Sequence, residues 1–471
     1  MNVLVIGSGG REHAIVWKLK QSPLVERLFC APGNAGISEL AECVNINADD
    51  FEALANFAEE KNVGLTVVGP EVPLSKGIVD FFSERKLKAF GPNRHAAMLE
   101  SSKIFAKEFM RRNGIPTAKF KEFRNADKAI DYIENLAECV VKADGLAAGK
   151  GVFVCRTQAD AADAVREIMD EKAFGAAGEK VIVEDLLEGE EASFLAFCDG
   201  ETVKPMVASQ DHKRVNDEDE GPNTGGMGAY SPAPIVSEEM QEKVMKTIML
   251  RAVKGMNKEG TPFKGVLYAG LMIDEETKKI SVLEFNARFG DPETQVILPR
   301  LESDLLPILE ACVDGKLKDV EVKWKTDAAT CVVMASGGYP GEYAKGKEIS
   351  GLGQAKEVKE AVVFHAGTKK EDGKVLTDGG RVLGVTATGA TIAQSIENAY
   401  KAVALISFEG AHYRKDIGRR ALEKEKSATP SGAEEVAEKK MPKNEAEEAG
   451  AQEEVLEREQ DGQETTGPET V

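Results

Sequence analysis

The sequence predicts an α/β protein with an N-terminal doubly wound parallel sheet, a central domain with a glycine-rich lid and a small C-terminal α+β domain. Three observations predict this class. Short apolar runs alternate with amphipathic stretches over roughly the first ninety residues, a glycine-rich loop lies between two apolar strands near residue 145, and the pattern changes again near Lys325. Strands that alternate with helices indicate a parallel sheet with helices on both faces.

The composition narrows the class of protein. The chain has 471 residues, of which 42% are hydrophobic, so it is long enough for about three domains. A net charge of -20 without a basic stripe argues against nucleic acid as a partner. The seven cysteines form no C-x-x-C pair, which favours reduced thiols. Without a basic N-terminal leader or a run of about 18 apolar residues, we expect no export, no membrane span and a cytoplasmic location.

The first strand is expected at residues 3–6, and the turn GSGGREHA from Gly7 joins it to a helix. In a dinucleotide-binding turn a glycine would stand at Glu12, and the next strand, which ends at Pro32, lacks the acid that binds a ribose. These departures exclude a nicotinamide site. A glycine turn with free backbone N–H groups at a helix start suits a phosphate monoester, and a purely structural turn is the alternative.

Three turns of this sheet fall at the same edge. Further strands are expected at residues 28–31, 65–68 and 88–90, with helices between them. Ligands of such sheets bind beyond the carboxyl ends of the strands. The turns that lie there are residues 7–13, 32–36 and 69–71. Their convergence predicts a substrate site.

A hairpin with a glycine-rich loop follows the predicted helix at residues 101–112. Its strands are expected at residues 140–142 and 152–154, and ADGLAAGKG from Ala143 joins them. The break at Pro116 indicates that this hairpin belongs to a new structural unit.

The glycine-rich loop departs from the P-loop pattern. Three residues instead of four separate Gly145 from Gly149, and Gly151 stands where a hydroxyl side chain would hold magnesium. Because Lys142 and Lys150 flank it, the loop can still close over phosphates with its backbone N–H groups. A surface hairpin without a ligand is the alternative.

Two later stretches have the composition of a binding site. Apolar residues in EDLLEGEE, from Glu184, can sandwich a purine ring, and Glu190 and Glu191 can accept hydrogen bonds from ribose hydroxyls. The polar, glycine-rich stretch 209–232 carries His212 and Lys213 beside Asp211, and loops of this length inside a compact enzyme are usually functional.

The strand in VLEFNARFGDPETQ, from Val282, carries the strongest chemical signal. Side chains alternate along a strand, so Glu284, Asn286 and Arg288 are expected on one face. The opposite, core-facing side is expected to carry Leu283, Phe285 and Ala287. A carboxylate and an amide oxygen suit a hard cation such as Mg²⁺, and the arginine suits an anion that the metal also contacts. The combination indicates a nucleoside triphosphate, and a solvated sheet edge is the alternative.

The last part of the chain predicts a third folded unit and a tail. Its elements are strands at 330–334 and near Val362 and Val382, and an amphipathic helix at 392–403. The isolated His365 and His412 are expected to be structural. Residues 427–471 are acidic and lack aromatic side chains, which predicts disorder.

The order of these stretches resembles the ATP-grasp superfamily. Eight blocks are similar to those of the phosphoribosylamine-glycine ligase family, also called glycinamide ribonucleotide synthetases: GSGGREHA, PGNAG, VGPE, KADGLAAGKG, SQDHKR, GPNTGGMGAYSP, EFNARFGDPETQ and FHAGT. The resemblance covers residues 1 to about 424. It implies an N-terminal substrate domain (pre-ATP-grasp) at 1–102, an ATP-grasp domain at 103–324 with its lid at about 118–187, a C-terminal domain at 325–426 and the disordered tail at 427–471.

The resemblance also implies an activity. Glycine, ATP and 5-phosphoribosylamine would give glycinamide ribonucleotide, ADP and phosphate through glycyl phosphate, the second step of de novo purine (IMP) biosynthesis. The implied cofactors are ATP and Mg²⁺ or Mn²⁺, and the implied partners are the two small substrates, with no nucleic acid and no membrane. A monomer is expected.

The family pattern implies a role for individual residues. The ATP contacts would be Lys103 and Lys142 at the phosphates, Glu184 and Leu186 at adenine, and Glu191 at ribose. The metal ligands would be Glu284 and Asn286, without a third protein ligand because residues 269–273 are apolar. The catalytic residues would be Arg288, between ATP and the acyl phosphate, and Lys142. The substrate contacts would be Gly9 and Gly10 at the ribosylamine phosphate, with Glu71, Asp211 and Lys213.

Two other functions stay open at this point. A different ATP-grasp carboxylate-amine ligase or carboxylase would share the ATP residues, and only the N-terminal turns and the Asp211 loop argue against it. A nucleotide-binding regulatory protein without turnover is the alternative outside enzymes, and the intact metal pair with Arg288 argues against that function.

Overall fold

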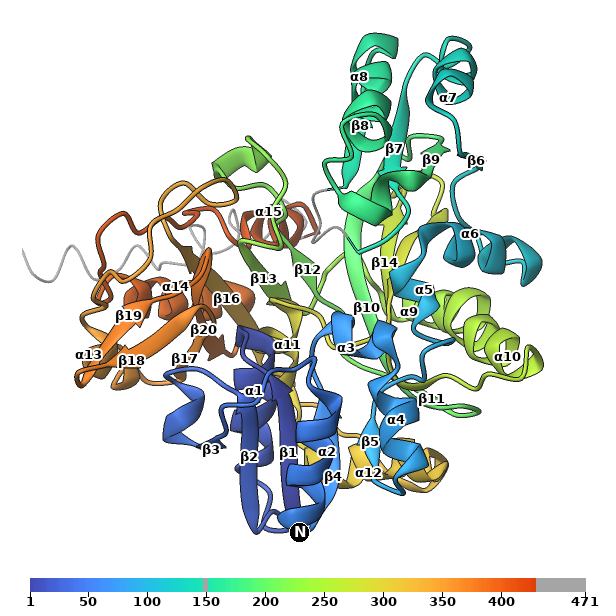
Figure 1. Cartoon of the computed structure of the whole chain (residues 1–471). Coiled ribbons are helices and arrows are strands. Elements are labelled where there is room, and N and C mark those ends of the chain that lie inside the picture. Colours follow the sequence, from blue (N-terminus) through green and yellow to red (C-terminus); the bar gives the residue numbers. More distant parts are fainter. Residues whose placement is uncertain (147–150, 429–471) are drawn as a thin grey trace, which may run out of the picture. The chain divides into compact units, whose positions relative to one another are not determined.

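The computed structural model (Figure 1) describes residues 1–146 and 151–428. It divides into two compact units, Met1–Ala421 and Leu422–Val471. The tip of the predicted lid loop, with Gly149 and Lys150, and the predicted tail from residue 429 on lie outside the described residues. Within the described ranges, no helix is both long and apolar enough to cross a membrane.

The N-terminal sheet is parallel throughout, as predicted. Its strands follow the order β3 (Glu42–Cys43), β2 (Arg27–Pro32), β1 (Asn2–Gly7), β4 (Val63–Val68) and β5 (Ala89–Phe90). The helices of this part are α1 (Gly10–Leu19), α2 (Phe51–Glu60), α3 (Glu71–Lys76) and α4 (Ile78–Glu84). Alternate residues of β1 enter two separate cores, Val5 with α1 and Leu4 with α2, so helices cover both faces. The prediction of a doubly wound sheet is confirmed.

The strand order places the turns after β1, β2 and β4 at one edge. β1 lies between β2 and β4, which is the point where the order of the sheet reverses. Hydrogen bonds from Gly33 N–H to Gly7 O (3.1 Å) and from Gly69 N–H to Ile6 O (3.1 Å) hold the three turns together. Their predicted convergence is confirmed.

The lid is a four-stranded antiparallel sheet with two helices. Its strands follow the order β6 (Phe120–Phe123), β9 (Val181–Glu184), β7 (Cys139–Ala143) and β8 (Val152–Cys155). The helices α7 (Ala126–Ile133) and α8 (Gln158–Met169) pack on it and share its core (Figure 1). Lys142 pairs with Val152 across the hairpin, so it lies one residue before the end of β7, close to the glycine-rich loop.

The central sheet is antiparallel and carries the predicted metal strand at its edge. Its order is β11 (Val203–Pro205), β10 (Glu190–Asp199), β14 (Lys264–Ile273) and β15 (Ile280–Asn286). The helices that follow or cover it are α5 (Met98–Ser101), α6 (Lys103–Arg112), α9 (Glu238–Val244), α10 (Leu250–Lys258), α11 (Glu293–Ile297) and α12 (Leu305–Asp314). The predicted helix 101–112 is interrupted at Ser102, whose hydroxyl accepts a hydrogen bond from Phe105 N–H (3.1 Å) and so caps α6.

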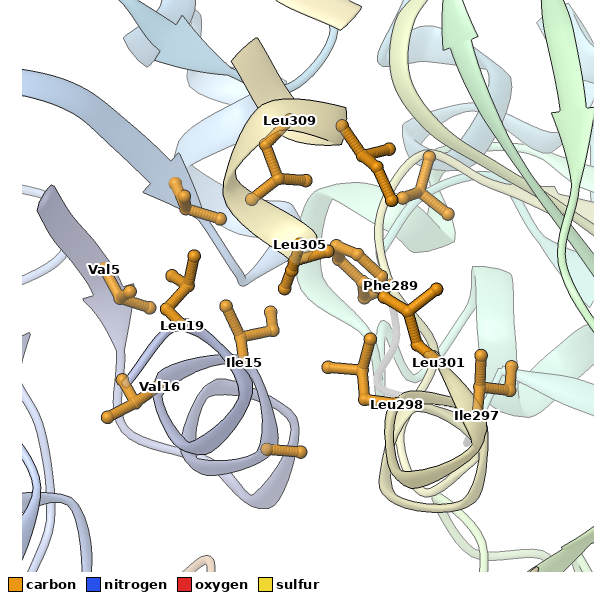
Figure 2. Close-up of a cluster of buried hydrophobic side chains, with 14 of the residues drawn as sticks. Val5, Ile15, Val16, Leu19, Phe289, Ile297, Leu298, Leu301, Leu305 and Leu309 are labelled. Atoms are coloured by element: carbon orange, nitrogen blue, oxygen red, sulfur yellow. The ribbon is translucent and has the colours of Figure 1, made fainter. Parts of the chain in front are cut away.

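One core joins the N-terminal sheet to the central part of the chain. Figure 2 shows Ile15 and Leu19 of α1 facing Leu298 and Leu305, which lie beside α11 and in α12. The same cluster includes Phe289, which follows Arg288 in sequence. Burial of these side chains removes apolar surface from water, and each fully buried leucine contributes about 1.5–3 kcal/mol. This shared core therefore fixes the position of the glycine turn relative to the end of β15.

The C-terminal sheet takes two of its strands from the centre of the chain. Its order is β12 (Gln210–Asp211), β13 (Gly228–Ser231), β16 (Ala328–Ala335), β20 (Arg381–Gly389) and β17 (Ala361–His365). A hairpin of β18 (Thr368–Glu371) and β19 (Lys374–Thr377) and the helices α13 (Leu352–Lys356), α14 (Ile392–Val403) and α15 (Arg419–Ala428) complete this part. The long polar loop predicted at 209–232 is thus built into the C-terminal sheet at both ends.

Candidate active site

A cavity of about 690 Å³ lies where the lid, the central sheet and the N-terminal turns meet. This volume suits a ligand of nucleotide size. All the predicted site residues line it except Gly9 and Gly10. Those that line it are Glu71, Lys103, Lys142, Glu184, Leu186, Glu191, Asp211, Lys213, Glu284, Asn286 and Arg288.

A β-bulge changes the faces of β15. On the neighbouring strand β14, Gly270 pairs with Glu284, but the next residue, Leu271, pairs with Val282. Leu283 is therefore an extra residue in β15. The strict alternation predicted for this strand is therefore wrong at Leu283, which lines the cavity instead of entering the core. Phe285 is buried as predicted. The displaced backbone offers the Leu283 carbonyl to Lys142 Nζ at 3.3 Å.

Glu284 is ionised in the cavity. Burial alone would raise the pKa of this carboxyl group, but the positive charges of Lys103, Lys213 and Lys142 hold the pKa at about 2. Among the cations of the described residues, Lys103 is the nearest, and its Nζ lies 3.8 Å from Glu284 Oε2. The ionised carboxylate can bind a divalent metal ion, and the neighbouring lysines can bind the phosphates that the same ion contacts.

The donor set fits a divalent cation. Asn286 Oδ1 lies on the same side of β15 as the Glu284 carboxylate, and it accepts a hydrogen bond from Arg288 Nη2 at 3.4 Å. Both donors are oxygens, which Mg²⁺ prefers, and Mg²⁺ usually takes one or two protein ligands together with phosphates and water. Among residues 1–146 and 151–428, no group of three acidic, histidine or cysteine side chains could hold a metal.

Lys142 shares a carboxylate oxygen with a second lysine. Glu184 Oε2 lies 3.0 Å from Lys142 Nζ and 2.8 Å from Lys107 Nζ. All three side chains are buried. Burial would raise the pKa of Glu184, but the two lysines lower it. Burial and the nearby Lys142 lower the pKa of Lys107 to about 8. One carboxylate thus balances two cations, and Lys142 can move to another anion without leaving Glu184 unpaired.

The other oxygen of Glu184 is available to a ligand. Glu184 Oε1 is buried and has no hydrogen-bond partner among residues 1–146 and 151–428. A buried carboxylate oxygen without a donor is costly. It lies at the start of the segment that carries Leu186 and Leu187, and both leucines line the cavity. The arrangement provides an apolar slot with an acceptor at its edge, as an amino-substituted purine requires.

Arg288 is held by two carboxylates from the N-terminal part of the chain. Its Nη2 lies 2.9 Å from Glu100 Oε1, and its Nε lies 3.4 Å from Glu71 Oε2. Arg11 Nη1 lies 3.7 Å from the same Glu71 oxygen. Although burial would raise the pKa of Glu71, the two arginines lower it to about 2. The guanidinium of Arg288 is therefore fixed between the N-terminal turns and β15.

The glycine turn is more closely packed than predicted. The expectation of free N–H groups is wrong for Gly9, because Gly9 N–H donates to Glu12 Oε2 at 2.6 Å, which is the half of a capping box that a glycine N-cap allows. A Cβ atom on Gly9 would lie 2.8 Å from that oxygen, and one on Gly10 would lie 2.7 Å from Gln295 Nε2. The two glycines thus allow close packing, and neither lines the cavity.

The polar loop contributes an acid and a lysine, as predicted. Lys213 Nζ contacts the carboxylate of Glu191, so the predicted ribose contact is already ion-paired. Burial and the nearby acids Glu293 and Glu191 raise the pKa of Asp211 to about 7, against the opposing effect of Lys213. A cation that entered beside Asp211 would lower this pKa again.

Several lining or supporting residues were missed from the sequence, among them Lys107, Glu293, Glu100 and Tyr268. Lys107 follows Lys103 by one helical turn on α6, a spacing that could have shown it. Glu293 lies in the same block as Arg288, and its Oε1 accepts hydrogen bonds from Tyr268 (2.7 Å) and Ser193 (3.1 Å). Glu100 and Tyr268 gave no signal, because their partners are distant in sequence.

The two isolated histidines lie outside the cavity, as expected. His365 is buried, and its N–H donates to His13 Nδ1 at 2.8 Å. His412 Nε2 lies 2.8 Å from Val215 O. Both histidines therefore have structural contacts.

Comparisons with known proteins match three domains of one family to consecutive parts of this chain. The family models described as the phosphoribosylglycinamide synthetase N domain, ATP-grasp (A) domain and C domain match residues 1–100, 101–294 and 329–420. The sequence is 52% identical over 418 residues to a phosphoribosylamine–glycine ligase of Caldanaerobacter subterraneus subsp. tengcongensis, covering 88% of this chain and 99% of that protein.

Two further relatives extend the comparison. A trifunctional purine biosynthetic protein adenosine-3 of Gallus gallus is 54% identical over 425 residues, which are 89% of this chain and 42% of that protein. The crystal structure of a phosphoribosylamine–glycine ligase from Thermotoga maritima superposes with a TM-score of 0.77 at 32% identity, covering 88% of this chain and 100% of that one.

Proposed function

The chain belongs to the phosphoribosylglycinamide synthetase family, and on this premise we propose that the cavity is where it joins glycine to 5-phosphoribosylamine with ATP. The reaction yields glycinamide ribonucleotide, ADP and phosphate, and it belongs to purine biosynthesis. One observation supports this proposal: an ionised carboxylate, an amide oxygen and an arginine at the end of β15 line one cavity together with a lysine of α6 and a lysine of β7.

The chemistry needs positioning and charge neutralisation from the protein. The carboxylate of glycine is a poor acyl donor, so one of its oxygens first takes the γ-phosphoryl group of ATP to give glycyl phosphate and ADP. The amine of phosphoribosylamine then attacks the carbonyl carbon, and phosphate leaves. No protein nucleophile takes part, so preorganised cations and donors supply the stabilisation.

The ATP site is proposed along the lid and α6. Lys103 and Lys142 would contact the phosphates, and Lys142 would exchange Glu184 for them while Lys107 keeps its ion pair with Glu184. Glu184, through its unpaired Oε1, and Leu186 would bind adenine. Glu191 would accept hydrogen bonds from the ribose hydroxyls. Its carboxylate would then either bind the ribose and Lys213 together or give up its ion pair with Lys213.

The metal site is proposed at Glu284 and Asn286. Their two oxygens favour Mg²⁺, and Mn²⁺ would use the same donors. When bound, the ion supplies positive charge to the phosphates. Arg288 and Lys142 are proposed as the catalytic residues, because Arg288 reaches the region between β15 and the N-terminal turns, where the acyl phosphate would form.

The substrate side is proposed at the N-terminal turns and the polar loop. Glu71, Asp211 and Lys213 would contact glycine or the ribosylamine. The Gly9–Gly10 turn would hold the phosphate of the ribosylamine, with Arg11 as the nearby cation. The Gly9 amide can serve only if Glu12 releases it.

Further features of the protein are proposed with the function. We place the domain boundaries at residues 1–102, 103–324 and 325–426, followed by a tail at 427–471, and propose a monomer in the cytoplasm whose partners are its small-molecule substrates.

One assay tests the function. Release of phosphate from ATP is measured with glycine and phosphoribosylamine together and with each omitted in turn. We expect release and glycinamide ribonucleotide formation only when both are present, because the acyl phosphate is consumed by the amine. Equal phosphate release without phosphoribosylamine, or with another amine in its place, would overturn the assignment.

A further inference from the structure

The loop that carries Asp211 and Lys213 is here called the substrate loop (residues 211–224); its own hydrogen bonds join its two arms, and residues outside the loop hold the turn at its tip. Within it, Val215 N–H donates to Pro222 O (3.1 Å) and Thr224 N–H to Lys213 O (2.7 Å). Its short helical turn includes two non-glycine residues with positive φ, Glu218 at 59° and Asp219 at 56°. Such backbone conformations persist only where the surroundings hold them.

A second segment, here called the C-terminal strap (residues 412–420), supplies this support. At its centre the Arg414 side chain is fully buried, with 0% of it exposed. Its Nη1 lies 2.7 Å from Asp219 Oδ1 and donates to Arg214 O at 3.1 Å. Its Nε and Nη2 donate to the carboxylate of Asp416 at 2.8 and 2.7 Å. A buried arginine is stable only when its donors are satisfied, so Arg414 ties the substrate loop to the strap.

Backbone groups reinforce the same junction in both directions. Lys415 N–H of the strap donates to Asp217 Oδ1 of the loop at 2.7 Å, and Glu218 N–H of the loop donates to Asp416 Oδ2 of the strap at 2.9 Å. Gly418 N–H donates to His212 Nε2 at 3.2 Å. These bonds fix the loop at both ends of its helical turn.

The strap also reaches the part of the loop that faces the cavity. Arg420 Nη2 donates to the backbone carbonyl of Asp211 at 3.2 Å, and Arg420 itself lines the cavity. The lysines proposed for ATP are held differently, since Lys103 faces Glu284 and Lys142 faces Glu184. The strap therefore acts on one side of the cavity.

We propose that the C-terminal strap positions Asp211 and Lys213 for glycine and phosphoribosylamine, with Arg414 as the central positioning residue. This inference rests on the proposed function, because it takes the substrate loop to contact these two substrates. Arg414 touches neither substrate and acts through the loop.

The test replaces Arg414 and measures each substrate separately. In Arg414→Met we expect the KM values for glycine and phosphoribosylamine to rise about tenfold or more, because a misplacement of about 1 Å can cost on the order of a hundredfold and the loop keeps its own hydrogen bonds. The Kd of a non-hydrolysable ATP analogue should stay at the wild-type value. Lys347→Met is the matched control, since it removes a cation whose pair with Glu409 is exposed to solvent.

A milder variant covers the case in which Arg414→Met does not fold. Tyr400→Phe removes a hydroxyl that donates to Arg414 O (2.8 Å) and accepts from Ile417 N–H (3.1 Å). It should raise the same two KM values by a smaller factor. Unchanged KM values in folded variants, or an equal loss of affinity for all three substrates, would overturn the proposal.

A separate variant distinguishes this inference from the proposed function. Lys213→Ala changes the loop contact itself. If Lys213→Ala leaves the KM values for glycine and phosphoribosylamine unchanged, the substrate role of the loop is wrong. If Lys213→Ala raises them and Arg414→Met does not, the loop assignment stands and the positioning role of the strap is wrong.

Discussion

Glu284 carries a charge that several cations stabilise from a distance, without a short ion pair in the described part of the chain. Its nearest cation is 3.8 Å away, beyond a short ion pair, although Lys103, Lys213 and Lys142 together hold its pKa at about 2. The side chain is 38% exposed to the cavity, so its removal leaves little buried space. A charge of this kind serves a ligand more than it serves stability.

Glu284→Ala should therefore abolish ligation without unfolding the protein. We expect kcat to fall by a factor on the order of 10² to 10³, because a charged group at the reacting phosphates is lost. Turnover at saturating Mg²⁺ and the melting temperature are the measurements. Turnover near the wild-type rate would remove β15 from the proposed mechanism.

Lys142 and Lys107 both contact Glu184, so Lys142 can be replaced while Glu184 keeps one cation. In Lys142→Ala, Glu184 keeps its contact with Lys107 at 2.8 Å, so the fold should persist. The KM for ATP should rise about tenfold or more, which corresponds to about 1.4 kcal/mol from a lost charge-assisted contact. The exposed Lys128 of α7 offers the control Lys128→Ala, and an unchanged KM for ATP in Lys142→Ala would contradict the lid assignment.

Single residues show what sequence patterns can and cannot predict. Glu284 and Asn286 were predictable because a strand places every second side chain on the same side. Glu100 was not, since its importance comes from an ion pair with Arg288, which lies 188 positions later and meets it only in the folded chain. The unpaired oxygen of Glu184 likewise depends on the geometry of two lysines on separate elements.

At the scale of elements, β15 shows where alternation fails. Its period was predicted correctly beyond Glu284, but the bulge at Leu283 depends on hydrogen bonding to β14. An alternating sequence pattern does not show which residue of a strand lacks a pairing partner on the neighbouring strand. The consequence is functional, because the bulge presents the Leu283 carbonyl to Lys142.

The start of α1 offers a prediction at the same scale. In Gly9→Ala the new methyl group would lie 2.8 Å from Glu12 Oε2, so Glu12 must move and the capping box is lost. We expect a loss of about 1 kcal/mol in unfolding free energy and a higher KM for phosphoribosylamine. Chemical denaturation and initial rates measure the two effects.

A loss of stability without any change in that KM would show that the turn is structural only. Gly373→Ala provides no matched control because its φ is +78°, whereas Gly353 lies in α13 with open space around its Cβ position. Gly353→Ala should leave this KM unchanged and raise the unfolding free energy by up to about 1 kcal/mol, because alanine favours the helix more than glycine does.

At the scale of the whole molecule, the sequence predicted the N-terminal sheet but not how the parts share strands. Alternating strands and helices specify a parallel sheet locally. In contrast, β13 pairs with β16 across about one hundred residues, and β12 joins the sheet through β13, so the polar loop was predicted as a loop and its sheet partners were not. Pairing over that separation has no local signature.

The N-terminal and C-terminal parts of the described chain also meet at two buried histidines. His13 of α1 accepts from His365 N–H of β17 at 2.8 Å, and the rings lie 5.6 Å apart. Burial, then the neighbouring His365, lower the pKa of His13 from 6.5 to about 3. Burial also lowers the pKa of His365 from 6.5 to about 4, with Glu39 opposing and Lys356 assisting.

These shifts predict that mild acid destabilises this junction. Below pH 6.5 the unfolded chain binds protons at both histidines while the folded chain does not, so stability is complete above pH 6.5 and falls with pH until about 4 for His365 and about 3 for His13.

His13→Asn keeps an acceptor near the Nδ1 position and removes one titrating ring. Its melting temperature should fall less than that of the wild type between about pH 7 and about pH 5. The exposed His95→Gln is the control and should follow the wild type. Parallel acid curves for His13→Asn and the wild type would show that another group sets the acid sensitivity.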